Sequence, residues 1–376
     1  MNIKSLDLLI VNGLLMDPFT GVEGKYSIGV QNGKIAGVYP EGAILPCYNA
    51  LLDLAGAYIT PGWIDLHTHV AYKQAVIGIE ADRIGIQQGV TTVVDAGSSG
   101  SKNFLQFEEN IIQKAKTRVL SWINISAAGL YEGRSELEDL ASIDVEATKK
   151  LVSCKAEIRG IKVRMSHSVV KETNTGGLKI AKALASQLHV PLFVHVGNFP
   201  PALGDVLNLL EQGDIVTHIF HGKAGGCLDA EEYILPELKA AIDRGVYLDL
   251  GHGTESCSFF RFKNAREKGI CIDSISTDLY SQNYSGPVYS LKHTMEKCMA
   301  LGMSFREVIT AVTLKPAIML NMPQLGRIKA GALADMTFFE KVEGEQTYTD
   351  ADGNQITGTQ QLQIKGVVRE GKVIRV

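Results

Sequence analysis

Short apolar runs alternate with longer amphipathic stretches from residue 62 to residue 278. The eight runs are rich in Val, Ile and Thr and mostly end in Gly, Ser, His or Asp, which is typical of buried parallel strands. The stretches between them carry apolar residues at helical spacing. The expected strands are residues 62–69, 90–97, 118–126, 158–166, 190–197, 215–220, 246–252 and 274–278, and expected helices include 103–116, 136–154, 178–189 and 230–244.

Strands that alternate with helices predict a parallel sheet in an α/β protein. Eight such units over about 260 residues match the size of a (β/α)8 TIM barrel. A doubly wound open sheet is the competing interpretation, and it would carry a G-x-G-x-x-G turn after the first strand. Because the sequence has no such turn there, the barrel is the favoured prediction.

The two ends of the chain have a different pattern, in which short strands are broken by turns. Neither end carries enough apolar surface for its own core. We therefore expect residues 1–58 and 325–376 to form one small β-sandwich domain beside a barrel of residues 59–324. The expected turns are Asn12-Gly13, Asn32-Gly33, Asp352-Gly353 and Glu370-Gly371.

The composition limits the class of partner. Hydrophobic residues make up 45% and charged residues 21% of the chain, as in a folded globular protein. The net charge is −4 and no basic run is present, which argues against nucleic acid or an anionic membrane as a partner. There is no leader pattern, no long apolar window and no CxxC pair among six scattered cysteines. We therefore expect a cytoplasmic protein with free thiols.

His67 and His69 end the first expected strand. Side chains two residues apart on a strand point to the same face, and barrel enzymes keep their active sites at the carboxyl ends of the strands. Two imidazoles on one face there form a metal-binding pair. The alternative is a pair of ordinary polar residues that leave a strand.

Four more strands place polar groups of this kind at the same end. His195, His218 and Asp278 lie in the fifth, sixth and eighth expected strands, and Lys162 lies within the fourth. A lysine in an apolar strand is costly unless it is paired or chemically changed. The alternatives for Lys162 are an ion pair with Asp65 or Asp95, or a Schiff base, and the alternative for Asp278 is a helix N-cap.

Five further residues are candidates for contact with a substrate. Arg164 follows Lys162 by two positions, and a guanidinium at a barrel mouth suits capture of a carboxylate; the equal alternative is an ion pair with an acidic loop residue. Asn124 ends the third strand, His221 follows His218, and His252 ends the seventh strand. Tyr289 lies in a segment after the eighth strand that we expect to cover the pocket.

This order of residues resembles the amidohydrolase superfamily. The match consists of HxH, Lys, His, His and Asp on strands one, four, five, six and eight, together with the segments at residues 57–65 and 326–336. Residues 160–166, 195–197 and 275–278 are most similar to the dihydroorotase-like branch of amidohydrolase/deacetylase metallohydrolases.

The resemblance implies a binuclear metal centre, most often zinc. His67, His69 and Asp278 would hold one ion, and His195 and His218 the other. Lys162 would bridge both ions as a carbamate formed with carbon dioxide. The ions would supply hydroxide near neutral pH, and Asp278 would act as the catalytic base and then as the acid.

The resemblance also implies a hydrolase that cleaves an acyl C–N or C–O bond. The favoured reaction is deacetylation of a small acetylated substrate that carries a carboxylate. Alternatives are hydrolysis of a cyclic amide, as in dihydroorotases, and deamination of adenine; one-metal deaminases need no bridging lysine, so Lys162 counts against the last. A scaffold that has lost catalysis would lack ligands, and all six positions are filled here. A homo-oligomer is expected from the resemblance.

Replacement of Arg164 by methionine tests its expected role. The guanidinium would be lost without a large change in side-chain length, so KM for a carboxylate-bearing substrate should rise strongly. Steady-state kinetics measures this effect, and an unchanged KM would contradict the assignment.

Overall fold

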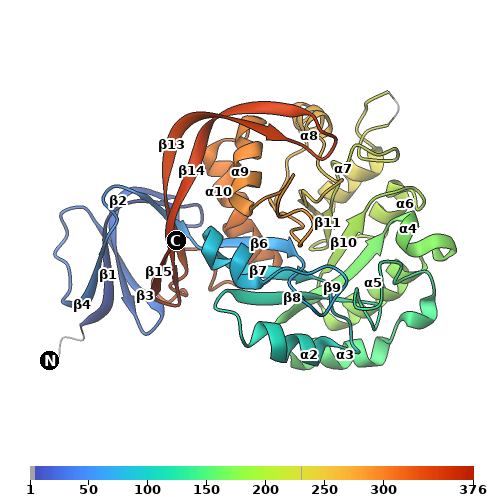
Figure 1. The fold of residues 1–376 in the computed structure, drawn as a ribbon, viewed down its shortest axis with the longest axis horizontal. Coiled ribbons are helices and arrows are strands. Elements are labelled where there is room, and N and C mark those ends of the chain that lie inside the picture. Colours follow the sequence, from blue (N-terminus) through green and yellow to red (C-terminus); the bar gives the residue numbers. More distant parts are fainter. Residues whose placement is uncertain (1–4, 230) are drawn as a thin grey trace.

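The computed structural model describes residues 5–229 and 231–376. Its centre is a sheet of seven parallel strands in the spatial order β12-β11-β10-β9-β8-β7-β6 (Figure 1). Each strand falls within one of the first seven expected strands. Most of their residues are buried, and apolar side chains point to both faces of the sheet. The strands are β6 (Trp63–Thr68), β7 (Val90–Ala96), β8 (Arg118–Asn124), β9 (Ile158–Met165), β10 (Leu192–Val196), β11 (Ile215–Thr217) and β12 (Tyr247–Asp249).

The expected eighth strand is an irregular segment that lies between β12 and β6. Parallel bridges join Asp249 to Ser274 on one side and Thr68 to Leu279 on the other. The backbone N–H of Asp278 donates to the carbonyl of His67 at 2.7 Å. Side-chain hydrogen bonds supplement this pairing, since Asp249 accepts from the hydroxyl of Ser274 and Asp65 accepts from that of Thr277. The segment is therefore held on both sides without forming a regular ladder.

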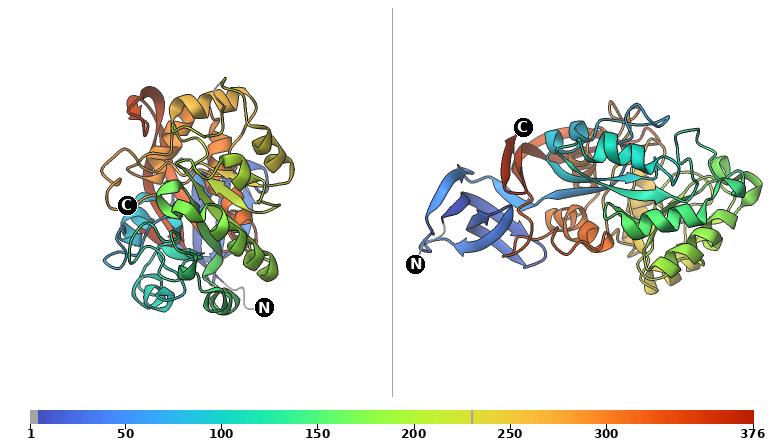
Figure 2. Two further views of the ribbon diagram at one scale, coloured as in Figure 1. Left: turned by 90° about the vertical axis from the view of Figure 1, so that its right-hand side faces the viewer. Right: turned by 90° about the horizontal axis from the view of Figure 1, so that it is seen from below.

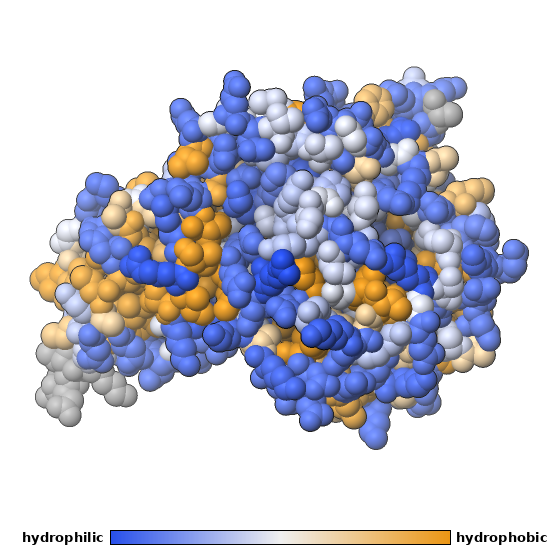
Figure 3. Space-filling view, viewed as in Figure 1, coloured by the Kyte–Doolittle hydropathy of each residue, from blue (hydrophilic) through white to orange (hydrophobic). Residues whose placement is uncertain are grey.

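The two chain ends meet in one mixed eight-stranded sheet, as the sequence predicts for their shared core. The order is β15-β14-β13-β5-β1-β2-β3, with β4 paired to β1. Figure 2 shows this part projecting from one end of the molecule, and Figure 3 shows apolar side chains gathered over it. Its core takes Leu8 and Ile28 from one end of the chain and Met336 and Val368 from the other. The strands are β1 (Leu6–Asp17), β2 (Val22–Gln31), β3 (Lys34–Pro40), β4 (Tyr48–Asp53), β5 (Tyr58–Pro61), β13 (Met336–Thr349), β14 (Gln355–Arg369) and β15 (Lys372–Arg375).

Three of the four expected turns in these ends join consecutive strands, and the fourth is wrong. Asn32-Gly33, Asp352-Gly353 and Glu370-Gly371 lie between β2 and β3, β13 and β14, and β14 and β15. Asn12-Gly13 lies within β1, where the register with β2 shifts between Ile10 and Gly13. Asn12 has a φ of 57°, so this pair forms a β-bulge rather than a chain reversal.

The helices lie between and after the parallel strands. Three of the four expected helices are shorter than predicted. Only Val145–Cys154 of residues 136–154 and Pro236–Asp243 of residues 230–244 are α-helical, and residues 103–116 contain a short α-helix that continues as a π-helical turn. Ala230, at the start of the range 230–244, lies outside the described residues, as do residues 1–4 of the N-terminal segment. Within the described ranges, no helix has the length and apolar character needed to cross a bilayer. The α-helices are α1 (Ala81–Ile84), α2 (Phe104–Phe107), α3 (Val145–Cys154), α4 (His167–Val170), α5 (Gly176–Leu188), α6 (Leu203–Leu207), α7 (Pro236–Asp243), α8 (Phe259–Glu267), α9 (Leu291–Ala300), α10 (Phe305–Val312) and α11 (Leu314–Met319). Shorter turns are η1 (Ile86–Gln88), η2 (Glu108–Ile112), η3 (Leu140–Ser142) and η4 (Lys171–Thr173).

Strands β13 and β14 extend beyond the terminal sheet as a hairpin arm over the helical side of the molecule (Figure 1). The arm packs on α9, where Glu296 accepts a hydrogen bond from the backbone N–H of Leu362 at 2.7 Å. At the tip, Asp350 accepts from the backbone N–H of Phe259 at 2.9 Å. The arm therefore connects the terminal sheet to α8 and α9.

Lys297 on α9 ties this arm to two other segments. Its buried ammonium donates to the carbonyls of Thr349 in the arm and Pro287 in the loop after the eighth segment, both at 2.7 Å. It also donates to Nε2 of His252 at 2.8 Å. Burial lowers the pKa of Lys297 to about 8.

Replacement of Lys297 by methionine should destabilise the fold by about 1–3 kcal/mol, because the buried Nε2 of His252 and two partly buried carbonyl groups would lose their donor. Urea unfolding followed by circular dichroism measures this. Lys150→Met, at an exposed position on α3, is the matched control and should change the free energy of unfolding by less than about 0.5 kcal/mol. Equal stability of the two variants would contradict the anchoring role.

Candidate metal centre and active-site cavity

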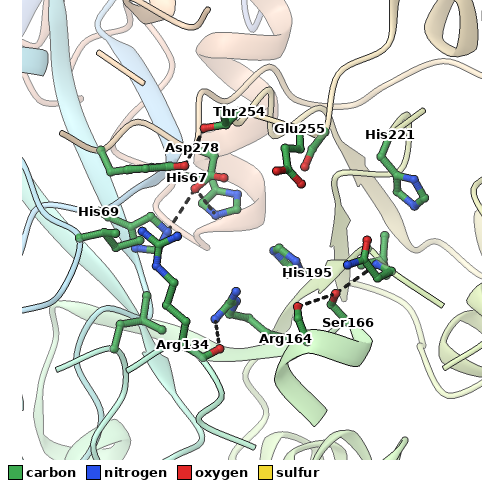
Figure 4. A pocket seen from close by; sticks show the side chains of 18 of the residues that line it. His67, His69, Arg134, Arg164, Ser166, His195, His221, Thr254, Glu255 and Asp278 are labelled. Carbon is green, nitrogen blue, oxygen red and sulfur yellow. Dashed lines mark hydrogen bonds and ion pairs between the residues drawn. The ribbon is translucent and has the colours of Figure 1, made fainter. Parts of the chain in front are cut away.

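A cavity of about 680 Å³ opens at the carboxyl ends of the parallel strands (Figure 4). Five of the six predicted metal ligands line it, namely His67, His69, Lys162, His195 and Asp278. The sixth, His218, is fully buried directly behind them. The structure therefore brings all six residues to one end of the sheet.

Asp278 lies at the centre of this group. One carboxylate oxygen is 3.3 Å from Nε2 of His67 and 3.1 Å from Nε2 of His69. The other oxygen is 3.7 Å from Nε2 of His218. His195 joins the group from β10, where its ring packs edge-on against His218 with ring centroids 4.4 Å apart.

Neighbouring groups set the tautomers of two histidines. Nδ1 of His218 donates to the carbonyl of Gly251 at 2.6 Å, which leaves Nε2 without a proton. Nδ1 of His67 lies 3.3 Å from the hydroxyl of Thr217, and that hydroxyl donates its own proton to Asp249 at 2.7 Å. Thr217 therefore accepts from His67, and Nε2 of His67 keeps its lone pair for the site. Such outer contacts orient metal-ligating histidines in proteins.

Lys162 is fully buried and faces His67, with Nζ 3.3 Å from Nε2 of that histidine. The expected alternative of an ion pair with Asp65 or Asp95 is not present, because both carboxylates accept hydrogen bonds from other groups. Burial lowers the pKa of Lys162 to about 7. Near neutral pH, Lys162 is thus a neutral amine in a large fraction of the molecules.

The backbone around the site is strained at two of the six residues. His218 has a φ of 72° and Asp278 a φ of 52°, a region that costs about 1–3 kcal/mol for residues of this kind. Glycines provide the space that the side chains need. A Cβ on Gly251 would lie 2.7 Å from Nδ1 of His218, and one on Gly97 would lie 2.7 Å from Cγ of Lys162.

Burial shifts the ionisation of most groups in the site. It lowers the pKa of His67 and His195 well below the ordinary value, and that of His218 to about 4. For Asp278, burial raises the pKa, but the hydrogen bond from His69 and the positive charge nearby outweigh it, so the pKa lies below the ordinary value. The site therefore offers neutral imidazoles and one carboxylate.

These donors fit a divalent metal ion. Ligand atoms of His67, His218 and Asp278 all lie within 4.8 Å of one another. Nε2 of His218 is buried and has no hydrogen-bond partner within the described residues. A buried imidazole nitrogen that lacks a donor is the group a metal ion would satisfy.

Arg164 lines the cavity and forms an ion pair with Glu136 at 3.0 Å. The carboxylate of Glu136 is 2% exposed. Asn124 is not among the residues that line the cavity; its amide donates to the carbonyl of Gly97 at 3.0 Å and to Glu136 at 3.4 Å. Asn124 therefore supports the wall behind Arg164 instead of reaching the cavity as expected.

The other three expected substrate contacts have different positions. His221 lines the cavity, and its Nδ1 is buried without a partner within the described residues. His252 is fully buried behind the wall, where it accepts from Lys297. Tyr289 is exposed and packs against His293 outside the cavity. The structure thus brings one of these three residues to the cavity.

Several residues that line the cavity were not expected from the sequence. Arg134 lies in the loop after β8, and Glu255 lies across the cavity from it (Figure 4). Lys223 also lines the cavity and forms an ion pair with Glu255 at 2.6 Å. Thr254 and Tyr280 share a hydrogen bond of 2.6 Å between their hydroxyl groups. Their only signal in the sequence is a position shortly after an expected strand, which many unrelated loop residues share.

The fold and the site define a protein that gathers metal-ligating side chains at the carboxyl ends of parallel strands. The chain belongs to the amidohydrolase family, whose model matches residues 58–374. The expected family is therefore confirmed, and with it a metal-dependent hydrolase.

Similar proteins carry three different names. A protein of Enterococcus faecalis described as a deacetylase is 38% identical over 92% of this chain and 93% of its own length. A crystal structure described as an adenine deaminase is 36% identical, covers 99% of this chain and 100% of that one, and has a TM-score of 0.94. Another, described as a dihydroorotase, is 33% identical, covers 98% and 97%, and has a TM-score of 0.90.

The stability of the metal-free protein should depend on His221. Burial lowers its pKa to about 4, so between pH 6.5 and pH 4 the unfolded chain binds a proton that the folded chain does not. This contribution to stability is complete above pH 6.5 and is lost as the pH falls. Between pH 7 and pH 5, His221→Asn should lose about 2 kcal/mol less stability than the wild type.

Urea unfolding in the presence of a chelator at both pH values measures this difference. His189→Asn is the matched control, because His189 is exposed and its left-handed backbone suits asparagine. If the free energy of unfolding falls equally in the His221 variant and the wild type, protonation of His221 is not the cause of the loss of stability at low pH.

Proposed function

We propose that the protein is a zinc-dependent deacetylase that hydrolyses an acyl C–N or C–O bond of a small acetylated carboxylate. The observation that carries this proposal is the convergence of four histidines, Lys162 and Asp278 on one cavity. The deacetylase name of a relative that matches nearly the full length supports the choice of reaction.

Two zinc ions are the proposed cofactors. His67, His69 and Asp278 would hold one ion, His195 and His218 the other, and Lys162 both. When bound, such ions lower the pKa of water to about 7 and polarise a carbonyl group. The low pKa of Lys162 supports its conversion to a carbamate: the neutral amine adds to the carbon of carbon dioxide and releases one proton. A buried cation would thereby become an anionic oxygen donor.

Asp278 is the proposed catalytic acid and base. Its pKa lies below the ordinary value, so it begins as an acceptor. It would take a proton from the attacking water and deliver it to the leaving nitrogen or oxygen. The hydrogen bond from the amide of Asn283 to the carbonyl of Asp278, at 2.7 Å, keeps its backbone in place.

The substrate is proposed to be a small anion. The cavity has the volume of an ordinary small-molecule site. Arg134, Arg164, Lys171 and Lys223 line it, and Glu255 is the one carboxylate in the described lining besides Asp278. An excess of positive side chains at the mouth would favour a carboxylate.

We also propose that the chain forms a closed barrel and a separate terminal domain. The segment around Ser274–Asp278 would complete a (β/α)8 barrel, which its bridges to both β12 and β6 support. Residues 1–58 and 325–376 would form a separate β-sandwich domain, which their common core supports. The protein is further proposed to act as a homo-oligomer.

Hydrolysis of a cyclic amide is the second candidate. The fold similarity to a protein described as a dihydroorotase favours it, and the same ligand set would serve. Deamination of adenine is less well supported, because one-metal deaminases need no bridging lysine and Lys162 therefore counts against that reaction.

The metal content of protein purified without chelator, together with a substrate panel, tests the proposal. The panel holds N-acetyl amino acids, O-acetyl 2-hydroxy acids, dihydroorotate and adenine. We expect about two equivalents of zinc per chain, release of acetate, and no ammonia from adenine. Lys162→Ala should lower both metal content and turnover, whereas the exposed Lys150→Ala should change neither.

Two outcomes would contradict parts of this proposal. About one equivalent of metal that is unaffected by Lys162→Ala would exclude the carbamate bridge. Opening of dihydroorotate without release of acetate from any acetylated acid would favour the cyclic amide reaction.

A further inference from the structure

The two arginines that line the cavity differ in how their charges are balanced. Nη1 of Arg164 donates to the buried carboxylate of Glu136 at 3.0 Å. Glu136 pairs with no other cation within the described residues, so its charge balances that of Arg164. Within the described residues, by contrast, no carboxylate lies within ion-pair distance of Arg134.

The guanidinium of Arg134 is nevertheless held in a defined place. Arg134 lies in the loop after β8, and its side chain reaches toward His69 and Asp278 (Figure 4). Nη2 donates to the side-chain carbonyl of Gln282 at 3.1 Å, and the guanidinium lies 5.8 Å from the ring centroid of Tyr280. Both partners are uncharged and belong to the segment that follows Asp278. They position the cation without neutralising it.

We infer that Arg134 binds the carboxylate of the substrate and that Arg164 is a positioning residue. This inference rests on the proposed function, because it assigns the substrate's anionic group. A guanidinium with free charge and unused donors gains more from a substrate carboxylate than one already paired with an acid. The ring of Tyr280, which lies 5.8 Å from the guanidinium of Arg134, is also 6.3 Å from the ring of His69, and His69 contacts Asp278. A carboxylate bound to Arg134 would therefore sit within the length of a small molecule from Asp278.

Arg164 supports Arg134 through the backbone. The same Nη1 that contacts Glu136 donates to the carbonyl of Arg134 at 3.2 Å. The pair of Arg164 and Glu136 thus holds the loop from which Arg134 extends. Replacement of Arg164 alone would leave the buried carboxylate of Glu136 unpaired, so this single variant would weaken acid binding whichever arginine contacts the substrate.

Two substrates that differ only in the charge of one group distinguish the roles of Arg134 and Arg164. The first measurement compares turnover of an acetylated acid that the enzyme hydrolyses with turnover of its primary carboxamide. The second compares equilibrium binding of the corresponding non-acetylated acid and amide. For Arg134→Met we expect kcat/KM and affinity for the acid to fall by about 10- to 100-fold, with less than about a threefold change for the amide.

The double variant Arg164→Met/Glu136→Gln removes the ion pair as a neutral unit, together with its support of the loop. It should lower the acid-to-amide ratio by no more than about threefold, because Arg134 keeps its charge and its contacts with Gln282 and Tyr280. Glu132→Gln, at an exposed position on the same loop, controls for disturbance of the loop.

Loss of the acid-to-amide ratio in the double variant, with retention of the ratio in Arg134→Met, would overturn the inference and assign the carboxylate to Arg164. Equal binding of acid and amide by the wild type would also overturn it. Selective binding of the acid that Arg134→Met abolishes, without any turnover, would support the inference and contradict only the proposed reaction.

Discussion

The structure at the carboxyl ends of the strands depends on one constraint, the burial of polar groups. These groups are Lys162, His67, His218 and the neighbouring carboxylates. Polar groups removed from water destabilise a protein unless they find partners. Here the outer carboxylates find them: Asp249 accepts hydroxyl hydrogen bonds from Thr217, Ser274 and Ser276. Lys162 instead lines the cavity, and Nε2 of His218 lies buried behind it without a hydrogen-bond partner within the described residues, so a metal ion would complete their environment.

Hydrogen bonds of the same kind hold a strained backbone at His218 and Asp278. His218 and Asp278 both have positive φ angles, which a chain keeps only where its surroundings determine the conformation. Asp65 accepts from the hydroxyl and the backbone N–H of Thr277, directly before Asp278. Gly251 follows β12 and accepts from His218. The irregularity of the eighth segment is therefore connected with the position of the Asp278 carboxylate at the centre of the site.

The cavity walls are linked to parts of the chain that lie far from the metal ligands. Lys297 joins the hairpin arm to Pro287 and to His252, so α9, the arm and two loops near the cavity share one buried ammonium. On the other wall, Arg164 connects β9 to the loop after β8 through Glu136. His252 and Arg164 were both expected to contact a substrate, and each supports a wall by way of a partner that the sequence pattern does not indicate.

The sequence by itself determined the family, the parallel strands and the six residues that the fold gathers at one end of the sheet. Apolar runs of strand length and a period of two along a strand depend on local geometry, and residues such as His67 and His69 therefore share a face in any parallel sheet. Only the tertiary structure decided which rim residues reach the cavity. The positions of Asn124, His252 and Arg134 depend on loop conformations and on partners such as Glu136, Lys297 and Gln282 that are distant in the chain. Local patterns carry no information about those contacts, because they form only when separate strands and loops are packed together.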